Sequence, residues 1–307
     1  MHRSVMLREV LEWSAVRPGG RYIDATLGGG GHAEAILDAS SPDGRLLGLD
    51  ADPDAIARCR GRLARFGGRF EAAHSRFGRV GDVAAERGFG GADGVLMDLG
   101  VSSFQLDEPE RGFSFRADGP LDMRMNPAEP VTAADLVNGL PEGELADVLR
   151  RYGEEPAARR IARRIVERRH VAPFRGTADL AAVVAAAAGR PGGRIHPATR
   201  TFQALRIAVN REMAELDDGL LGALGALRAG GRMTVISFHS LEDRAVKRFF
   251  RAHQPRSEAL PEGGERWVGE APPVRVLTRK PVEPDEAETA ENPRARSARL
   301  RAAERTA

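Results

Sequence analysis

The stretch MDLGVSSFQ, from Met97 to Gln105, holds the residues that best suit chemistry in this sequence. An apolar run ends there in the carboxylate of Asp98, and Gly100, Ser102 and Ser103 follow with a flexible backbone and two hydroxyl groups. A carboxylate at the end of a buried strand is unfavourable unless a partner or a ligand compensates for its charge. Methylation of an exocyclic amine needs such acceptors to orient its N–H bonds and to stabilise developing positive charge. The stretch therefore favours an amine as the reacting group, with a helix or turn cap as the structural alternative for Asp98.

A second candidate site is the glycine-rich turn at 27–32, LGGGGH, between a strand pattern at 21–26 and a helix pattern at 33–39. Glycines let backbone N–H groups approach a ligand, although a turn that needs glycine only for steric reasons is the alternative. Asp50 closes the next strand pattern about 20 residues on, where Rossmann-like folds place the carboxylate that accepts both ribose hydroxyls. The run at 24–28, DATLG, differs from G-x-G-x-x-G and favours S-adenosylmethionine over NAD. No lysine lies in the turn or directly after it, which excludes a P-loop.

The elements that must position these residues alternate between strand and helix patterns. Such alternation predicts a parallel sheet in an α/β domain. The strand patterns lie at 21–26, 45–50, 69–73, 93–98 and 232–238, and helix patterns lie between the first four, at 33–39, 54–66 and 78–87. Residues 272–280 could add an edge strand. We expect the polar, charged residues 281–307 to be only partly ordered.

The middle of the chain shows helix patterns without an intervening strand pattern. They cover 132–138, 141–152, 155–169, 177–188 and 197–213. The sequence therefore predicts a Rossmann-like sheet with an inserted all-helical subdomain, and the family resemblance described below implies that the sheet is that of a class I methyltransferase. We expect residues 1–110 and 214–307 to form the cofactor-binding domain, and residues 111–213 to form the insertion, an RNA-binding subdomain.

Composition limits the class of protein. The chain has 307 residues, a formal net charge of +2 and one cysteine, Cys59, which excludes an internal disulfide or a cysteine-cluster zinc site. The longest apolar run, 180–189, is too short to cross a bilayer, so we expect a cytoplasmic protein without a membrane partner. Apart from Lys247 and Lys280 all the basic side chains besides histidine are arginines, which suit phosphate forks.

Basic residues gather in the predicted insertion. The helix pattern at 155–169 repeats arginine at a spacing of four, at Arg160, Arg164 and Arg168, and such like charges repel unless an anionic partner such as RNA relieves them. A solvated face balanced by nearby glutamates is the alternative. Further polar sets lie at 196–211 and in the tail at 293–305, which we expect to order on RNA.

One cluster near the end of the last predicted strand resembles a metal site. His239, Glu242 and Asp243 have suitable side chains, but methyl transfer requires no metal, so we expect none. Substrate positioning, or capping of a helix that begins near Ser240, is the expected use of these residues.

The sequence resembles the RsmH/MraW family of S-adenosylmethionine-dependent methyltransferases, which modify cytosine N4 in 16S ribosomal RNA. The resemblance rests on segments in the family's order across nearly the whole chain, at 2–10, 22–32, 49–53, 97–103, 110–125, 196–212, 236–244 and 292–298. One departure is Phe104, where the family usually has proline, which could loosen the loop that carries Gln105. The resemblance implies methyl transfer to a cytidine in the small (30S) ribosomal subunit.

The resemblance also implies roles for individual residues. Cofactor binding would use Gly30, Gly31 and His32 on the methionine side, Asp50 at the ribose, Phe77 beside the adenine, and Asp98 with Gln105 to complete the pocket. Catalysis would involve Asp98 and Ser102, with the identity of the base left open. The candidate RNA-binding residues are Arg160, Arg163, Arg164, Arg200, Arg206 and His239.

Two alternative functions remain at this stage. An amino-methyltransferase that acts on another RNA or on DNA is one, but the Asp-Pro-Pro-Tyr signature expected for the DNA enzymes is replaced here by Asp98-Leu-Gly-Val. A non-catalytic nucleotide- or RNA-binding module is the other, and it would not need the amine acceptors around Asp98.

Overall fold

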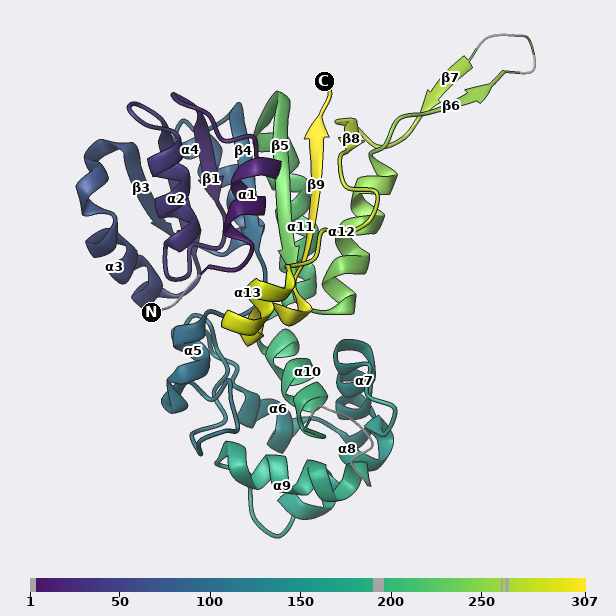
Figure 1. Cartoon of the computed structure of the whole chain (residues 1–307). Coiled ribbons are helices and arrows are strands. Elements are labelled where there is room, and N and C mark those ends of the chain that lie inside the picture. Colours follow the sequence, from purple (N-terminus) through teal and green to yellow (C-terminus); the bar gives the residue numbers. More distant parts are fainter. Residues whose placement is uncertain (1–3, 190–195, 261, 263–264) are drawn as a thin grey trace. The chain divides into compact units, whose positions relative to one another are not determined.

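The computed structural model of the chain describes residues 4–189, 196–260, 262 and 265–307, which form two units (Figure 1). The sheet unit contains the chain up to Gly100 and Ala214–Ala307, and the helical unit contains Val101–Met213. The first boundary lies at Gly100 rather than at residue 110, because Val101 and Leu106 already pack against the core of the helical unit. Among the described residues, no helix has the length and apolar character needed to cross a membrane.

The sheet unit is built on seven strands in the order β3-β2-β1-β4-β5-β9-β8. The first five strands are parallel, whereas β9 runs antiparallel to β5 and β8. Their bounds are β1 Arg21–Asp24, β2 Arg45–Asp50, β3 Phe70–His74, β4 Ala92–Asp98, β5 Leu227–Ser237, β8 Val274–Val276 and β9 Arg299–Arg305. The order 3-2-1-4-5 confirms the predicted Rossmann-like sheet, and β8 confirms the predicted edge strand.

Apolar strands, and a side-chain cap on helices such as α3, explain why this sequence forms the sheet unit. Ile23, Leu47 and Leu96 are buried in β1, β2 and β4, because a parallel sheet is covered on both faces. Asp52 caps α3 by accepting a hydrogen bond from Asp54 N at 3.0 Å. The helices of this unit are α1 Leu7–Trp13, α2 Gly31–Ala39, α3 Pro53–Arg62, α4 Val80–Glu86, α11 Glu212–Ala226, α12 Ser240–Ala252 and α13 Glu286–Glu291, with short 3₁₀ turns η1 Ala64–Arg69, η2 Phe77–Arg79 and η4 Pro293–Ser297.

The C-terminal segment differs from the expectation. Residues 281–307 were expected to be only partly ordered, which is wrong, because β9 lies inside the sheet between β5 and β8. Leu300 and Ala302 are buried, and Arg301 Nε donates to Asp243 Oδ1 at 2.6 Å. The tail therefore does not supply a free basic arm for RNA. Arg301 is paired inside the fold, whereas Arg296 remains exposed.

A hairpin between α12 and β8 was not predicted. It pairs β6 Arg256–Ala259 with β7 Glu265–Val268 in antiparallel register, and Figure 1 shows it projecting away from the main sheet. Its strands are only four residues long, so the sequence offers little periodicity from which to identify them.

The helical unit has a core of its own. Leu145, Leu149, Ile161, Ile165 and Leu205 are fully buried in it. Its elements are α5 Ser103–Asp107, η3 Pro109–Arg111, α6 Ala133–Gly139, α7 Glu142–Gly153, α8 Ala158–Arg169, α9 Thr177–Ala188 and α10 Thr199–Asn210. Each predicted helix pattern of the insertion thus corresponds to a helix here.

The last of these helices is shorter than expected. The pattern at 197–213 predicted one helix, but α10 ends at Asn210, because Arg211 adopts a left-handed conformation with φ of 55°. Asn210 Nδ2 donates to Met123 O at 2.7 Å, and Asn210 Oδ1 accepts from Met125 N at 2.8 Å. The end of α10 therefore holds the irregular loop before α6 in place.

Candidate active site

The ends of β1 and β4 bring the two candidate stretches of the sequence together. The strands are paired with Asp24 opposite Leu96, and Thr26 Oγ1 accepts a hydrogen bond from Asp98 N at 2.6 Å. The glycine-rich turn that follows β1 is therefore tied to the carboxyl end of β4. His32, in the first turn of α2, lies with Nε2 3.5 Å from Asp98 Oδ2.

Four buried polar atoms of Asp24, His32 and Asp98 have no hydrogen-bond partner within the described part of the chain. They are Asp24 Oδ2, His32 Nδ1, His32 Nε2 and Asp98 Oδ1. Buried polar groups are nearly always hydrogen-bonded, so this group of atoms marks a position where a ligand belongs. The carboxylate acceptors fit a cationic donor, such as the amino group of S-adenosylmethionine.

Asp24 is the residue that the sequence reasoning did not assign. It lies in the run DATLG and is 1% exposed at the end of β1. The signal that could have identified it is the same as for Asp98, a carboxylate that closes a buried apolar strand.

The protonation of this cluster depends on burial and on mutual charges. Burial raises the pKa of Asp24 to about 7, although the charge of His32 and the N–H of Thr26 oppose this effect. Burial favours a lower pKa for His32, but the contact with Asp98 and the charge of Asp24 outweigh it and raise the pKa. Asp24 therefore titrates near neutral pH, and His32 keeps its proton to a higher pH than a free imidazole does.

The raised pKa of Asp24 predicts a pH-dependent stability. The pKa of Asp24 is about 7 in the folded protein and about 3.9 in the unfolded chain, so a proton bound to Asp24 stabilises the folded protein. This contribution to the free energy of unfolding is complete below about pH 4 and is lost as pH rises through about 7. Asp24→Asn should therefore flatten the pH dependence of the unfolding free energy over this range. Urea unfolding of both proteins without cofactor measures it. Equal slopes against pH would show that Asp24 does not titrate in this way.

The glycine-rich turn has little room for side chains. Gly30 has φ of +76°, and a Cβ there would lie 2.9 Å from Cys59 Sγ. A Cβ on Gly31 would lie 2.1 Å from Ser4 Oγ. Both predicted cofactor-binding glycines therefore keep the backbone at the start of α2 closely packed and free of side chains.

Asp50 stabilises the same turn from the end of β2. Its Oδ2 accepts from Gly28 N at 2.7 Å, and its Oδ1 accepts from Asp52 N at 2.8 Å. Burial raises the pKa of Asp50 to about 6, although these two N–H groups favour the ionised form. Each oxygen retains a further lone pair, so the carboxylate still has capacity for the predicted ribose hydroxyls.

Phe77 begins η2, shortly after β3, the strand next to β2. Its ring packs against α11, where a Cβ on Gly219 would lie 2.7 Å from Phe77 Cδ2. The glycine thus leaves space for the ring. The role of Phe77 beside an adenine stays a prediction.

Ser102 and Gln105 form a capping box at the start of α5, in the helical unit. Ser102 Oγ accepts from Gln105 N at 3.3 Å, and Gln105 Oε1 accepts from Ser102 N at 3.0 Å. These contacts give both side chains a structural role. Their predicted roles in catalysis and cofactor binding remain predictions.

The arginines of α8 differ in their availability. Arg159 and Arg163 are exposed and have no hydrogen bond or ion pair to another described residue. By contrast, Arg160 Nη2 donates to Ala188 O at 2.6 Å, and Arg164 pairs with Glu167 at 2.9 Å. Arg159 and Arg163 are thus the arginines of this face that have the fewest interactions with other residues of the protein.

Two further predicted RNA-binding arginines lie on α10. Arg200 is exposed and donates to Glu154 O at 3.4 Å. Arg206 is engaged with both carboxylate oxygens of Glu212, at 2.8 and 2.7 Å, and its side chain is 15% exposed. Arg206 is therefore a weaker candidate for phosphate binding than Arg200.

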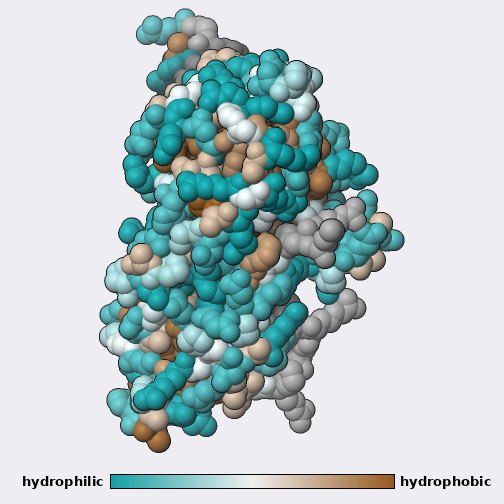
Figure 2. All heavy atoms as spheres, turned by 90° about the vertical axis from the view of Figure 1, so that its left-hand side faces the viewer, coloured by the Kyte–Doolittle hydropathy of each residue, from teal (hydrophilic) through white to brown (hydrophobic). Residues whose placement is uncertain are grey.

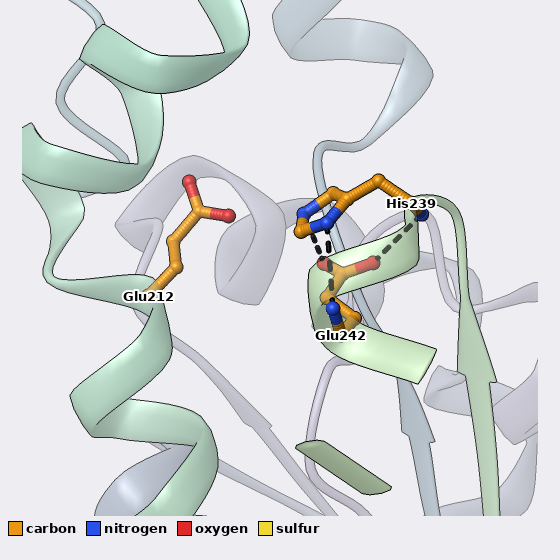
Figure 3. A group of neighbouring side chains, drawn as sticks. All are labelled: Glu212, His239 and Glu242. Atoms are coloured by element: carbon orange, nitrogen blue, oxygen red, sulfur yellow. Dashed lines mark hydrogen bonds and ion pairs between the residues drawn. The ribbon is translucent and has the colours of Figure 1, made fainter. Parts of the chain in front are cut away.

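His239 caps α12, which is the structural alternative that the sequence offered (Figure 3). Its Nδ1 accepts from Glu242 N at 3.4 Å, and its Nε2 lies 3.1 Å from Glu242 Oε1. Asp243 is paired with Arg301. Glu212, also drawn in Figure 3, belongs to the helical unit, where it pairs with Arg206. The role of His239 in RNA binding stays a prediction.

Figure 2 shows the face formed by the left-hand side of Figure 1, and it is mostly hydrophilic with scattered apolar residues. Among the described residues, the large apolar side chains with substantial exposure are Val131, Val171, Leu221 and Leu260. They are far apart in the sequence and do not by themselves indicate a binding surface.

Comparisons with known proteins agree across the whole chain. A family model described as the MraW methylase family matches residues 1–306. "Ribosomal RNA small subunit methyltransferase H" of Geobacter sulfurreducens is 56% identical over 306 residues, which cover 99% of this chain and 98% of the relative. The protein of the same name from Syntrophobacter fumaroxidans is 54% identical, with coverage of 99% and 96%.

Proposed function

Because the chain belongs to the MraW methylase family, we propose that it transfers a methyl group from S-adenosylmethionine to N4 of a cytidine, cytidine 1402, in 16S ribosomal RNA. The observation that supports this most is the pair of buried, unpaired carboxylate oxygens of Asp24 and Asp98 beside the glycine-rich turn. The substrate is the RNA within the small (30S) subunit, so the protein acts in the cytoplasm.

The residues of this edge divide between cofactor and substrate. Asp24 Oδ2 would accept from the ammonium group of S-adenosylmethionine, and Asp50 would accept from its ribose hydroxyls. When bound, the cofactor supplies a methyl group activated by a sulfonium. Asp98 Oδ1 would accept an N–H of the target amine, stabilise its developing positive charge and receive its proton. Gly100, with φ of +96°, keeps the backbone after Asp98 open to a planar base.

Methylation assays test the function directly. The protein is incubated with labelled S-adenosylmethionine and either small ribosomal subunits, free 16S RNA or DNA, and the modified nucleoside is identified by mass spectrometry. We expect N4-methylcytidine at one position of the 16S RNA. Methylated DNA, or another RNA as the preferred substrate, would support the alternative amino-methyltransferases, and binding without methylation would support a non-catalytic module.

We propose that the exposed arginines of α8 bind RNA phosphates. The double variant Arg159→Ala, Arg163→Ala should weaken RNA binding and reduce the slope of log affinity against log salt by up to about two units. Affinity for S-adenosylmethionine should be unchanged. Titrations at several salt concentrations measure both effects.

The matched control removes the same charge from the other unit. Arg79 and Arg87 are exposed on and beside α4, and their double substitution by alanine should leave the salt slope nearly as it is in the wild type. Equal salt slopes for the α8 variant and the wild type would mean that Arg159 and Arg163 are solvated and do not bind RNA phosphates.

A further inference from the structure

Asp24, His32 and Asp98 form a buried cluster of ionisable groups. Asp24 is 1% exposed and His32 is 6% exposed, while the Asp98 side chain is 25% exposed. The other charged or titratable groups that act on this cluster are Asp50 from β2, Cys59 from α3 and Glu288 from α13. Thr26 also contacts the cluster, since its N–H donates to Asp24 Oδ1 at 3.1 Å and its Oγ1 accepts from Asp98 N. Ala33 and Ile36 are buried in the same helix as His32.

Such a cluster binds protons tightly in the protein alone. Two carboxylates that share a buried site repel each other when both are ionised, and a proton or a cation relieves that repulsion. His32 Nε2 faces Asp98 Oδ2 at 3.5 Å, so the imidazole supplies positive charge on one side. Asp24 Oδ2 has no hydrogen-bond donor among the described residues.

A ligand with an ammonium group brings a second source of positive charge to the same oxygens. The ammonium has three N–H donors. It loses a proton less readily than a buried carboxylic acid does. Positive charge from the ligand and positive charge from the bound proton therefore compete. The ligand and the proton are then thermodynamically linked.

We propose that binding of S-adenosylmethionine displaces about one proton from Asp24 and His32, which lie beside Asp98, so that its affinity rises with pH. The inference rests on the proposed function, because it takes the cofactor from there. It assigns His32 as the positioning residue, because its Nε2 lies 3.5 Å from Asp98 Oδ2 and its charge acts on Asp24.

Calorimetry measures the displaced protons without any methyl transfer. S-adenosylmethionine is titrated into the full-length protein in phosphate and in Tris, which differ in ionisation enthalpy, at about pH 6, 7 and 8. We expect the observed binding enthalpy to differ between the two buffers by the amount that corresponds to release of about one proton near pH 6 to 7. The affinity should rise by up to about tenfold per pH unit on the acid side and level off above the pKa values of Asp24 and His32.

Two analogues separate the chemical groups that drive the release. S-adenosylhomocysteine keeps the ammonium but lacks the sulfonium charge, so it should release nearly as many protons as S-adenosylmethionine. Methylthioadenosine lacks the amino acid part and should bind with no proton release. Equal release by methylthioadenosine would overturn the proposal, because the ammonium would then not be its cause.

Variants identify the protonated groups. Asp24→Asn and His32→Gln retain hydrogen-bonding capacity without titrating, and each should lower the number of released protons to less than about half of the wild-type value. His74→Gln is the matched control, since this histidine ends the neighbouring strand β3 and is exposed, and it should release protons as the wild type does.

The outcomes distinguish this proposal from the proposed function. Binding of S-adenosylmethionine with identical heats in both buffers would overturn the proton linkage and leave the cofactor assignment intact. Absence of any binding would overturn both. Melting curves verify that each variant folds, and the wild-type comparison of buffers and analogues is decisive without any variant.

Discussion

Asp98→Asn is expected to lower the rate of methyl transfer at least about a hundredfold in a protein that still folds. The substitution keeps the shape of the side chain but removes the negative charge that stabilises the amine as it becomes cationic. An interaction that matters mainly in the transition state affects turnover more than substrate binding. Single-turnover methyl transfer to small ribosomal subunits at saturating cofactor measures the effect, together with a melting curve.

A companion variant separates catalysis from capping. Ser102 caps α5, so Ser102→Ala should lower stability by about 0.5–2 kcal/mol. If capping is its main role, the single-turnover rate should stay near the wild-type value. A structural cap at position 98 would tolerate asparagine well, so a wild-type rate in Asp98→Asn would rule out the catalytic role of this carboxylate.

Local signals explain why most of the sheet unit could be predicted. The apolar run 45–50 matches β2, and the order Asp52-Pro53 marks the first turn of α3 as the structure has it. The glycines at 28–31 break the pattern between β1 and α2 in a way that few other residues produce. These features depend on neighbours in the sequence, so the sequence alone reveals them.

The C-terminal strand depends on distant partners, and it was missed for that reason. Residues 299–305 contain three arginines, which read as a solvated tail. In the structure, Asp243 neutralises Arg301, and Arg305 Nη1 donates to Leu227 O at 2.6 Å. Only the fold brings these acceptors to the strand.

The same limitation applies to the candidate site. The sequence indicated Asp98, Asp50 and His32 by position and by resemblance, but it could not show that His32 faces Asp98 or that Asp24 is buried without a donor. Charge patterns likewise cannot show that Arg206 is engaged by Glu212. Pairing is a property of the three-dimensional arrangement, and it decides which charges are available for a ligand.

Replacement of Asp50 by alanine is expected to weaken binding of S-adenosylmethionine about tenfold to a hundredfold. Hydrogen bonds to a charged acceptor contribute roughly 1.5–3 kcal/mol, and the variant loses those to the ribose hydroxyls. Calorimetric titration of the cofactor measures the change. An unchanged affinity would contradict the assignment of Asp50 to the ribose.

The structure shows a second way in which this substitution could weaken binding. Asp50 also accepts from the backbone N–H groups of Gly28 and Asp52, so alanine would loosen the glycine-rich turn as well. A thermodynamic cycle with a 2′-deoxyribose analogue of the cofactor separates the two effects. If Asp50 binds the 2′-hydroxyl, removal of that hydroxyl should weaken binding to the wild type and change binding to Asp50→Ala very little. Equal losses in both proteins would show that Asp50 acts through the turn and that another group holds the ribose.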